Sequence, residues 1–181
     1  MKTQPQTIGL FWGSDTGATD GVAADMLELL TPHFKVKPHE VFRIKPDDFK
    51  SFDYLILGLS TWHDGQLQSD WDSFYDDFCK VDLTGKTVAL FGLGDQVGYS
   101  EYFVDGMGVI GQQVLNAGGK IIDLWPTEGY HFDSSKAAFK EDWFCGLAID
   151  EEFQPELTNE RLDRWTIQII SEFKEVMRVI A

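Results

Sequence analysis

Short apolar segments alternate with amphipathic ones along this chain of 181 residues. The apolar runs Tyr54–Leu59 and Lys86–Gly92 have the composition of strands that are buried on both faces of a sheet. Further strands are expected over Thr7–Gly13, Phe34–Phe42 and Lys120–Trp125. Apolar residues at helical spacing predict helices over Thr19–Leu30, Leu67–Phe78, Phe103–Asn116 and Leu157–Ile180.

Strict alternation of strand and helix predicts an α/β fold with a doubly wound, five-stranded parallel sheet and helices on both faces. The stretch between Trp125 and Leu157 has weak periodicity and is interpreted as an insertion with small strands of its own. With no repeat and no linker, residues 1–181 are expected to form a single domain. Loops that follow parallel strands meet at one sheet edge, so three are expected to converge: Gly13–Thr19, Ser60–Gln66 and Leu93–Tyr102.

The chain is strongly acidic, with 30 Asp and Glu against 15 Lys and Arg and a formal net charge of −15. Such a surface repels nucleic acid and anionic membranes and favours basic protein partners. Cys79 and Cys145 lack the spacing of metal ligands and are expected to be free, buried thiols. The N-terminus lacks the apolar core of a signal peptide, which predicts a cytoplasmic protein.

The first of the three loops has the chemistry of a phosphate cradle. Ser14, Thr16 and Thr19 offer hydroxyl groups, Gly17 allows close approach of the backbone, and a predicted helix N-terminus follows. No Lys or Arg occurs between Lys2 and Lys35, and the loop is not a Walker A motif. These features favour the permanently bound phosphate of a cofactor. The alternative is an ordinary turn in which Ser and Thr cap the helix.

The other two loops each carry an aromatic residue. Trp62 stands at the tip of the second loop, where its exposure is unfavourable unless it covers a ligand or folds back on the helix that starts at Leu67. Tyr99 lies in the glycine-containing third loop, either at a site or simply exposed. Together with the phosphate cradle, the two aromatics indicate a site for a flat ring with a phosphate tail.

Several stretches, in this order and spacing, carry a specific family resemblance. They are Ser14–Thr19, Ser60-Thr61-Trp62, Gly65 with Ser69-Asp70-Trp71, Leu90–Tyr99, Trp125–Tyr130 and Phe144–Glu151. From about Ile8 to Phe173 the chain resembles the flavodoxins of the long-chain bacterial type. The resemblance implies strand order 2-1-3-4-5, a fifth strand interrupted by an insertion, and tightly bound FMN. It also implies low-potential one-electron transfer between redox enzymes, without catalytic residues or a metal.

The resemblance further implies roles for individual residues. Ser14–Thr19 would hold the FMN phosphate, Trp62 and Tyr99 would sandwich the isoalloxazine ring, and backbone amides near Asp95 would face its pyrimidine edge. The carbonyl of the His63–Asp64 peptide would turn to accept a hydrogen bond from flavin N5–H. The full candidate cofactor-binding set is Ser14, Asp15, Thr16, Gly17, Ala18, Thr19, Ser60, Thr61, Trp62, His63, Asp64, Gly65, Leu93, Gly94, Asp95, Tyr99 and Tyr102.

The sequence departs from common family patterns at three positions. His63 stands where many relatives have Asn, Tyr or Gly, so the turned peptide should be harder to reach. Tyr102 replaces a frequent Asn, and Ala18 replaces a frequent Lys or other polar residue. We hypothesise that Asp64 lies near the ring and lowers the potential of its full reduction. Trp125, Trp143 and Trp165 are interpreted as core residues, and Asp150 as structural.

Two other functions remain open at this stage. An FMN-dependent NAD(P)H:quinone reductase on the same fold would need an open pocket over the ring, which Trp62 and Tyr99 would cover. A receiver domain without flavin would need a phosphoacceptor Asp at the end of the first strand, where Gly13 and Ser14 stand. For the carrier, a monomer is expected. Its expected partners are basic redox proteins such as a ferredoxin/flavodoxin–NADP reductase, a pyruvate oxidoreductase, a radical-SAM enzyme or nitrogenase.

Overall fold

A parallel five-stranded sheet forms the centre of the computed structural model, which describes residues 7–180. Its strand order is β2-β1-β3-β5-β10, with the short β6 also paired to β5. The strands are β1 (Thr7–Trp12), β2 (Lys35–Glu40), β3 (Tyr54–Trp62), β5 (Thr87–Leu93), β6 (Lys120–Ile121) and β10 (Leu147–Ile149). Counting β6 and β10 as one strand, this is the predicted order 2-1-3-4-5.

The fifth strand of the sheet is made from two separate pieces of chain. β6 pairs with the beginning of β5 (Lys120 opposite Thr87), and β10 pairs with its end (Ile149 opposite Leu93). The predicted interruption of this strand is therefore confirmed. A continuous strand over Lys120–Trp125 is wrong, however, because the chain leaves the sheet after Ile121.

The insertion between β6 and β10 forms a small antiparallel sheet in the order β7-β9-β8. Its strands are β7 (Trp125–Pro126), β8 (Ala138–Lys140) and β9 (Trp143–Phe144). The prediction that the insertion has strands of its own is thus confirmed. The apolar segment after β6 ends at Trp125, which belongs to this second sheet. Hydropathy alone therefore could not separate β6 from β7.

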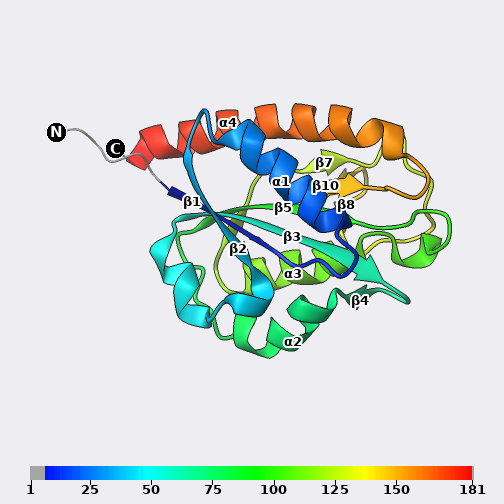
Figure 1. The fold of residues 1–181 in the computed structure, drawn as a ribbon, viewed down its shortest axis with the longest axis horizontal. Helices are drawn as coiled ribbons and strands as arrows, with labels where there is room; N and C mark the ends of the chain where they lie inside the picture. The colour runs from blue at the N-terminus through cyan, green and yellow to red at the C-terminus, as the bar shows by residue number, and fades with distance from the viewer. Residues whose placement is uncertain (1–6, 181) are drawn as a thin grey trace.

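Within residues 7–180, four helices cover the two faces of the main sheet, as Figure 1 shows. α1 (Ala18–Leu30) and α4 (Thr158–Ile180) lie on one face, and α2 (Ser69–Phe78) and α3 (Asp105–Asn116) lie on the other. Short 3₁₀ turns occupy Val41–Arg43, Pro46–Ser51, Ser100–Tyr102 and Pro155–Leu157. Within residues 7–180, no helix is both long and apolar enough to cross a bilayer.

Large aromatic side chains fill the core between the sheet and α2. Phe11 stacks on Phe49 with ring centroids 4.4 Å apart. The fully buried Trp71 of α2 donates its indole N–H to the carbonyl oxygen of Gly58 in β3 at 2.9 Å. This hydrogen bond ties α2 to the strand that leads to the second loop, so the loop starts from a rigid base.

Two helices begin later than their periodicity predicts, for local reasons. α2 starts at Ser69 because the side chain of Gln68 caps it, accepting a hydrogen bond from the Trp71 amide at 3.2 Å. α3 starts at Asp105 because Val104 adopts a left-handed conformation, with φ of 50°. In both cases the preceding apolar residues pack elsewhere in the fold.

Three burial predictions are confirmed and two are wrong. Trp125 and Trp165 are buried as expected, but Trp143 is 43% exposed on the insertion. Cys145 is buried and Cys79 is exposed, and both are free thiols. Cys79 follows the last residue of α2, where the helix end turns its side chain away from the core.

Candidate functional site

The three predicted loops extend from the carboxyl ends of β1, β3 and β5, which lie side by side at one edge of the sheet. The second loop differs from its prediction. β3 continues through Trp62 and turns back into β4 (Gln66–Leu67), and the two strands form an antiparallel hairpin. Trp62 is therefore the last residue of a strand, held in register opposite Gln66, and does not belong to a free loop.

The first loop presents unpaired backbone donors at the start of α1. Gly17 has φ of 93°, which favours glycine, and its amide donates to the Ser14 hydroxyl oxygen at 3.1 Å. The Ser14 hydroxyl proton stays free to donate to a ligand. Because the first amides of a helix have no intrahelical acceptor, those of Ala18 and Thr19 remain without a partner among residues 7–180. Thr16 is exposed, whereas the Thr19 side chain is buried.

The carboxylate of Asp15 is engaged by the start of α2 and does not serve the cradle. It accepts hydrogen bonds from the Gln68 amide group at 2.9 Å, from the Ser69 backbone at 3.3 Å and from the Ser69 hydroxyl. Partial burial acts to raise the pKa of Asp15, but these hydrogen bonds outweigh it and lower the pKa below its usual value. The α2 N-terminus thus stabilises an acid that would otherwise repel a bound anion.

The hairpin turn contains two residues in the left-handed region. His63 has φ of 43° and Gly65 has φ of 84°, and the Gly65 amide donates to the His63 carbonyl oxygen at 2.9 Å. His63 and Asp64 are exposed. The half-buried Trp62 donates its indole N–H to the Ser60 hydroxyl at 3.0 Å. In this conformation the His63 carbonyl is already engaged, and turning its peptide would break that bond.

The third loop is held by the side chain of Asp95. Its carboxylate accepts hydrogen bonds from the amides of Val97 (3.0 Å) and Gly98 (2.6 Å), an arrangement that stabilises tight turns. Tyr99 follows and is 43% exposed, while the Leu93 side chain is buried. The Gly94 amide donates to the carbonyl oxygen of Ile149 in β10 at 3.0 Å. Leu93 and Asp95 can therefore offer a ligand mainly backbone groups.

The hairpin is the element that joins the other two loops. Asp15 of the first loop, with Trp62 and His63 of the second, lines a cavity of about 590 Å³. On the other side, a Cβ atom placed on Gly65 would lie 3.2 Å from the Tyr102 ring. Tyr99 does not line this cavity. The first loop therefore meets the hairpin, and the hairpin meets the third loop, as the predicted convergence requires.

Several residues that shape the site are absent from the candidate set. The side chain of the buried Gln96 donates to Asp150 at 2.7 Å and accepts from the His131 amide at 2.6 Å. Asp150 also accepts hydrogen bonds from the backbone amides of Glu152 and Phe153, which confirms its structural role. Neither Gln68 nor Gln96 could be identified from the sequence, because the role of a buried Gln depends on hydrogen-bond partners that are distant along the chain.

The buried Asp105, at the first position of α3, is also absent from the candidate set. An acid in the first turn of a helix is a recognised signal for a favourable interaction with the helix N-terminus, so this residue could have been found.

Comparisons with known proteins agree on one family. The family model described as Flavodoxin matches residues 10–165. A flavodoxin of Klebsiella pneumoniae is 44% identical over 165 residues, covering 91% of this chain and 93% of that protein. A flavodoxin of Synechococcus elongatus is 43% identical and covers 92% of this chain and 97% of that protein. Among solved structures, Fusobacterium nucleatum flavodoxin bound to flavin mononucleotide is 32% identical with a TM-score of 0.86, covering 92% and 98% of the two chains.

Proposed function

Because the chain belongs to the flavodoxin family, whose members are electron carriers rather than enzymes, we propose that it transfers single electrons at low potential on tightly bound FMN. The flavin supplies the redox chemistry, and the protein supplies binding, orientation and electrostatics. The observation that carries this proposal is an open helix N-terminus at the sheet edge where the half-buried Trp62 ends β3 and the exposed Tyr99 lies in the loop after β5.

The first loop fits the phosphate of FMN. The free amides of Ala18 and Thr19 and the hydroxyl groups of Ser14 and Thr16 form a donor set without any cation. Helix N-termini bind phosphate through such amides and through the helix dipole. The Asp15 charge is held by the start of α2. Ser14–Thr19 would therefore hold the phosphate mainly through backbone N–H groups.

The second and third loops fit the ring. Trp62 and Tyr99 would pack on the isoalloxazine, and the remaining candidates would contribute mainly backbone groups. The latter are Ser60, Thr61, His63, Asp64, Gly65, Leu93, Gly94, Asp95 and Tyr102. Asp64 is exposed at the tip of the hairpin, where its charge would oppose full reduction of the flavin to an anion. We expect Asp64→Asn to raise the potential of the second electron, and an unchanged potential would exclude this role.

The acidic surface supports docking to basic redox proteins. The net charge of −15 would accelerate encounters with them at low ionic strength. Flavodoxins pass electrons to redox partner proteins. For this chain we propose partners among the ferredoxin/flavodoxin–NADP reductases, pyruvate oxidoreductases, radical-SAM enzymes and nitrogenase, with the carrier acting as a monomer. A cytoplasmic location is consistent with the exposed free thiol of Cys79.

An anaerobic redox titration of the purified protein, followed by its visible spectrum, tests the proposal. We expect a bound flavin that is reduced in two separate one-electron steps. Reduction by NADPH alone, without a reductase, would instead favour the quinone reductase. A colourless protein that takes up no FMN would overturn the proposal.

The phosphate role has its own test in the apoprotein. Hydrogen bonds to charged groups contribute about 1.5–3 kcal/mol each, so Ser14→Ala with Thr16→Ala should weaken FMN binding by at least about tenfold. Riboflavin lacks the phosphate and serves as the matched control ligand. Equal weakening for both ligands, measured by flavin fluorescence quenching, would contradict the assignment of the first loop.

A further inference from the structure

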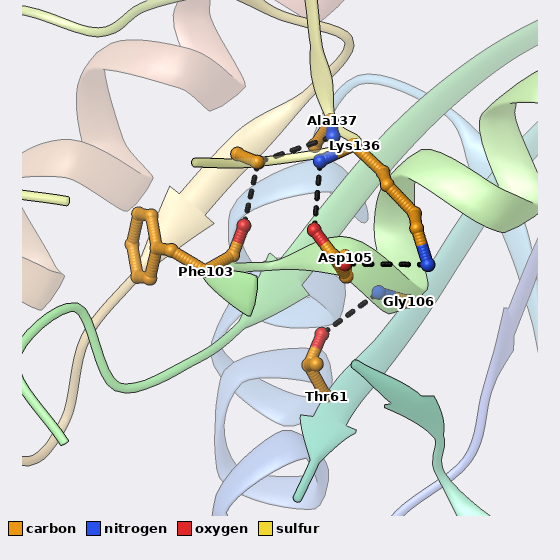
Figure 2. Close-up of polar contacts among 7 residues, drawn as sticks. Thr61, Phe103, Asp105, Gly106, Lys136 and Ala137 are labelled. Atoms are coloured by element: carbon orange, nitrogen blue, oxygen red, sulfur yellow. Dashed lines mark hydrogen bonds and ion pairs between the residues drawn. The ribbon is translucent and has the colours of Figure 1, made fainter. Parts of the chain in front are cut away.

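The insertion contacts the start of α3 through a short segment, residues 135–137. The Ser135 hydroxyl donates to the Phe103 carbonyl oxygen at 2.5 Å and accepts from the Ala137 amide at 3.1 Å. Figure 2 shows how this segment meets the chain just before α3 and how Lys136 reaches over Asp105. The insertion is thus fixed to the element that immediately follows the third loop.

Lys136 binds both oxygens of a buried carboxylate. Its backbone amide donates to Asp105 Oδ1 at 2.7 Å, and its ammonium group lies 3.5 Å from Asp105 Oδ2. The Asp105 side chain is 3% exposed, whereas that of Lys136 is 61% exposed. A buried carboxylate needs partners for both oxygens. Here one partner is a backbone group that any residue would supply, and the other is a side chain specific to position 136.

The hairpin formed by β3 and β4 contacts the first turn of α3 at two places, one at the end of β3 and one at the turn. At the β3 end, the Thr61 hydroxyl accepts a hydrogen bond from the Gly106 amide at 2.9 Å (Figure 2). At the turn, a Cβ atom on Gly65 would lie 2.7 Å from Asp105 Oδ2. The oxygen that pairs with the Lys136 ammonium is therefore the one that faces the turn.

We propose that Lys136 is a positioning residue: by occupying Asp105 Oδ2, it holds the conformation of the hairpin turn 63–65 and so adjusts the potential of the bound flavin. This inference rests on the proposed function, because it requires FMN at the hairpin. Without the ammonium group, Oδ2 is a buried, charged acceptor against the turn, and it competes for the turn amides. The Gly65 amide, which now donates to the His63 carbonyl, is the first of these donors.

Three variants separate this role from a general loss of charge or stability. Lys136→Met keeps the aliphatic stem and the backbone hydrogen bond to Asp105, so the insertion stays docked. Lys136→Arg restores the cation. Lys140→Met is the matched control, because Lys140 is an exposed lysine of the same insertion that forms no ion pair within residues 7–180.

The first measurement is native-state amide hydrogen exchange of the apoprotein, which needs no FMN. Since partly exposed ion pairs contribute up to about 1 kcal/mol, we expect Lys136→Met to accelerate exchange at Gly106 by about fivefold, because the hairpin is held less firmly on α3, and to slow exchange at Gly65, whose amide gains a buried carboxylate acceptor. Exchange at Leu90, in the centre of β5, should be unchanged. Lys136→Arg and Lys140→Met should both resemble the unmodified protein at all three amides.

The second measurement is the pair of one-electron potentials of the flavin-bound protein. We expect Lys136→Met to shift the first of them by more than Lys140→Met does, and Lys136→Arg to restore it. Equal potentials in the two Met variants would overturn the proposal, even if exchange differs. Equal exchange in the two would also overturn it. If the unmodified protein binds no FMN, the proposed function fails on that observation alone, and the link from Lys136 to the potential falls with it.

Discussion

Asp123 is a buried acid whose protonation should make the stability of the fold depend on pH. It lies just after β6, is 7% exposed and has φ of 58°. Its Oδ2 atom has no hydrogen-bond partner among residues 7–180. Burial, and secondarily the nearby charge of Glu172, raise the pKa of Asp123 from 3.8 to about 7. The folded protein therefore holds this proton at pH values at which the unfolded chain has released it.

The sign and size of the effect follow from that difference. Stability falls as pH rises from about 4 to about 7, because only the unfolded state ionises freely, and it levels off above the folded pKa. The full pKa shift corresponds to about 4 kcal/mol. Asp123 also lines a cavity of about 380 Å³ together with Lys120 and Lys140. Water and these charges screen part of the cost of ionising Asp123, so we expect the free energy of unfolding to be about 2 kcal/mol lower above pH 7.

Asp123→Asn tests this reasoning, since Asn has the shape of protonated Asp and tolerates a left-handed conformation. Urea unfolding followed by circular dichroism should show equal stability of the two proteins near pH 4.5. The variant should be about 2 kcal/mol more stable at pH 8. Glu175→Gln, an exposed acid of α4, is the control for loss of one charge. A stability difference that stays constant from pH 5 to pH 8 would refute the argument.

Three further substitutions probe the hairpin and its base. Gly65→Ala should destabilise the fold by about 2–3 kcal/mol in urea, clearly more than Gly17→Ala, because only the first adds a steric clash to left-handed strain. Similar losses for the two would contradict this. Trp71→Phe should cost about 1 kcal/mol, since it removes one of the two hydrogen bonds that the Gly58 carbonyl oxygen accepts, the other coming from the Gly13 amide; an unchanged urea midpoint would refute the contribution of that bond. His63→Gly should stabilise the fold by about 1 kcal/mol in urea, because His63 already has a left-handed φ of 43° in the resting turn and glycine adopts it without strain. A less stable variant would contradict this reading of the turn.

Hydropathy predicted the layers of the fold because each element must bury one face or both. It failed at the fifth strand, because β6 leaves the sheet after Ile121 and the distant β10 pairs with the rest of β5. Parallel pairing joins segments that are distant in sequence, and periodicity carries no information about which segment pairs with which. The left-handed Val104, which delays α3, is likewise imposed by tertiary packing.

The position of the candidate site was predictable for a different reason. Loops after parallel strands share one edge, so a phosphate-type loop and two aromatic loops had to be neighbours. The directions of their side chains were not predictable. Asp15 turns to Gln68 and Ser69, more than fifty positions away in the sequence, and the Asp95 carboxylate folds back on its own loop. Such choices depend on which donors the completed fold brings within reach.

The split fifth strand also determines how the molecule presents itself to other copies. Long, continuous edge strands offer a template on which further chains can add by backbone pairing. Here one edge of the sheet is made of two pieces of two and three residues. The opposite edge, β2, has Lys35, Lys37 and Pro38, and proline lacks an amide donor. Both edges are therefore poor templates for aggregation by backbone pairing.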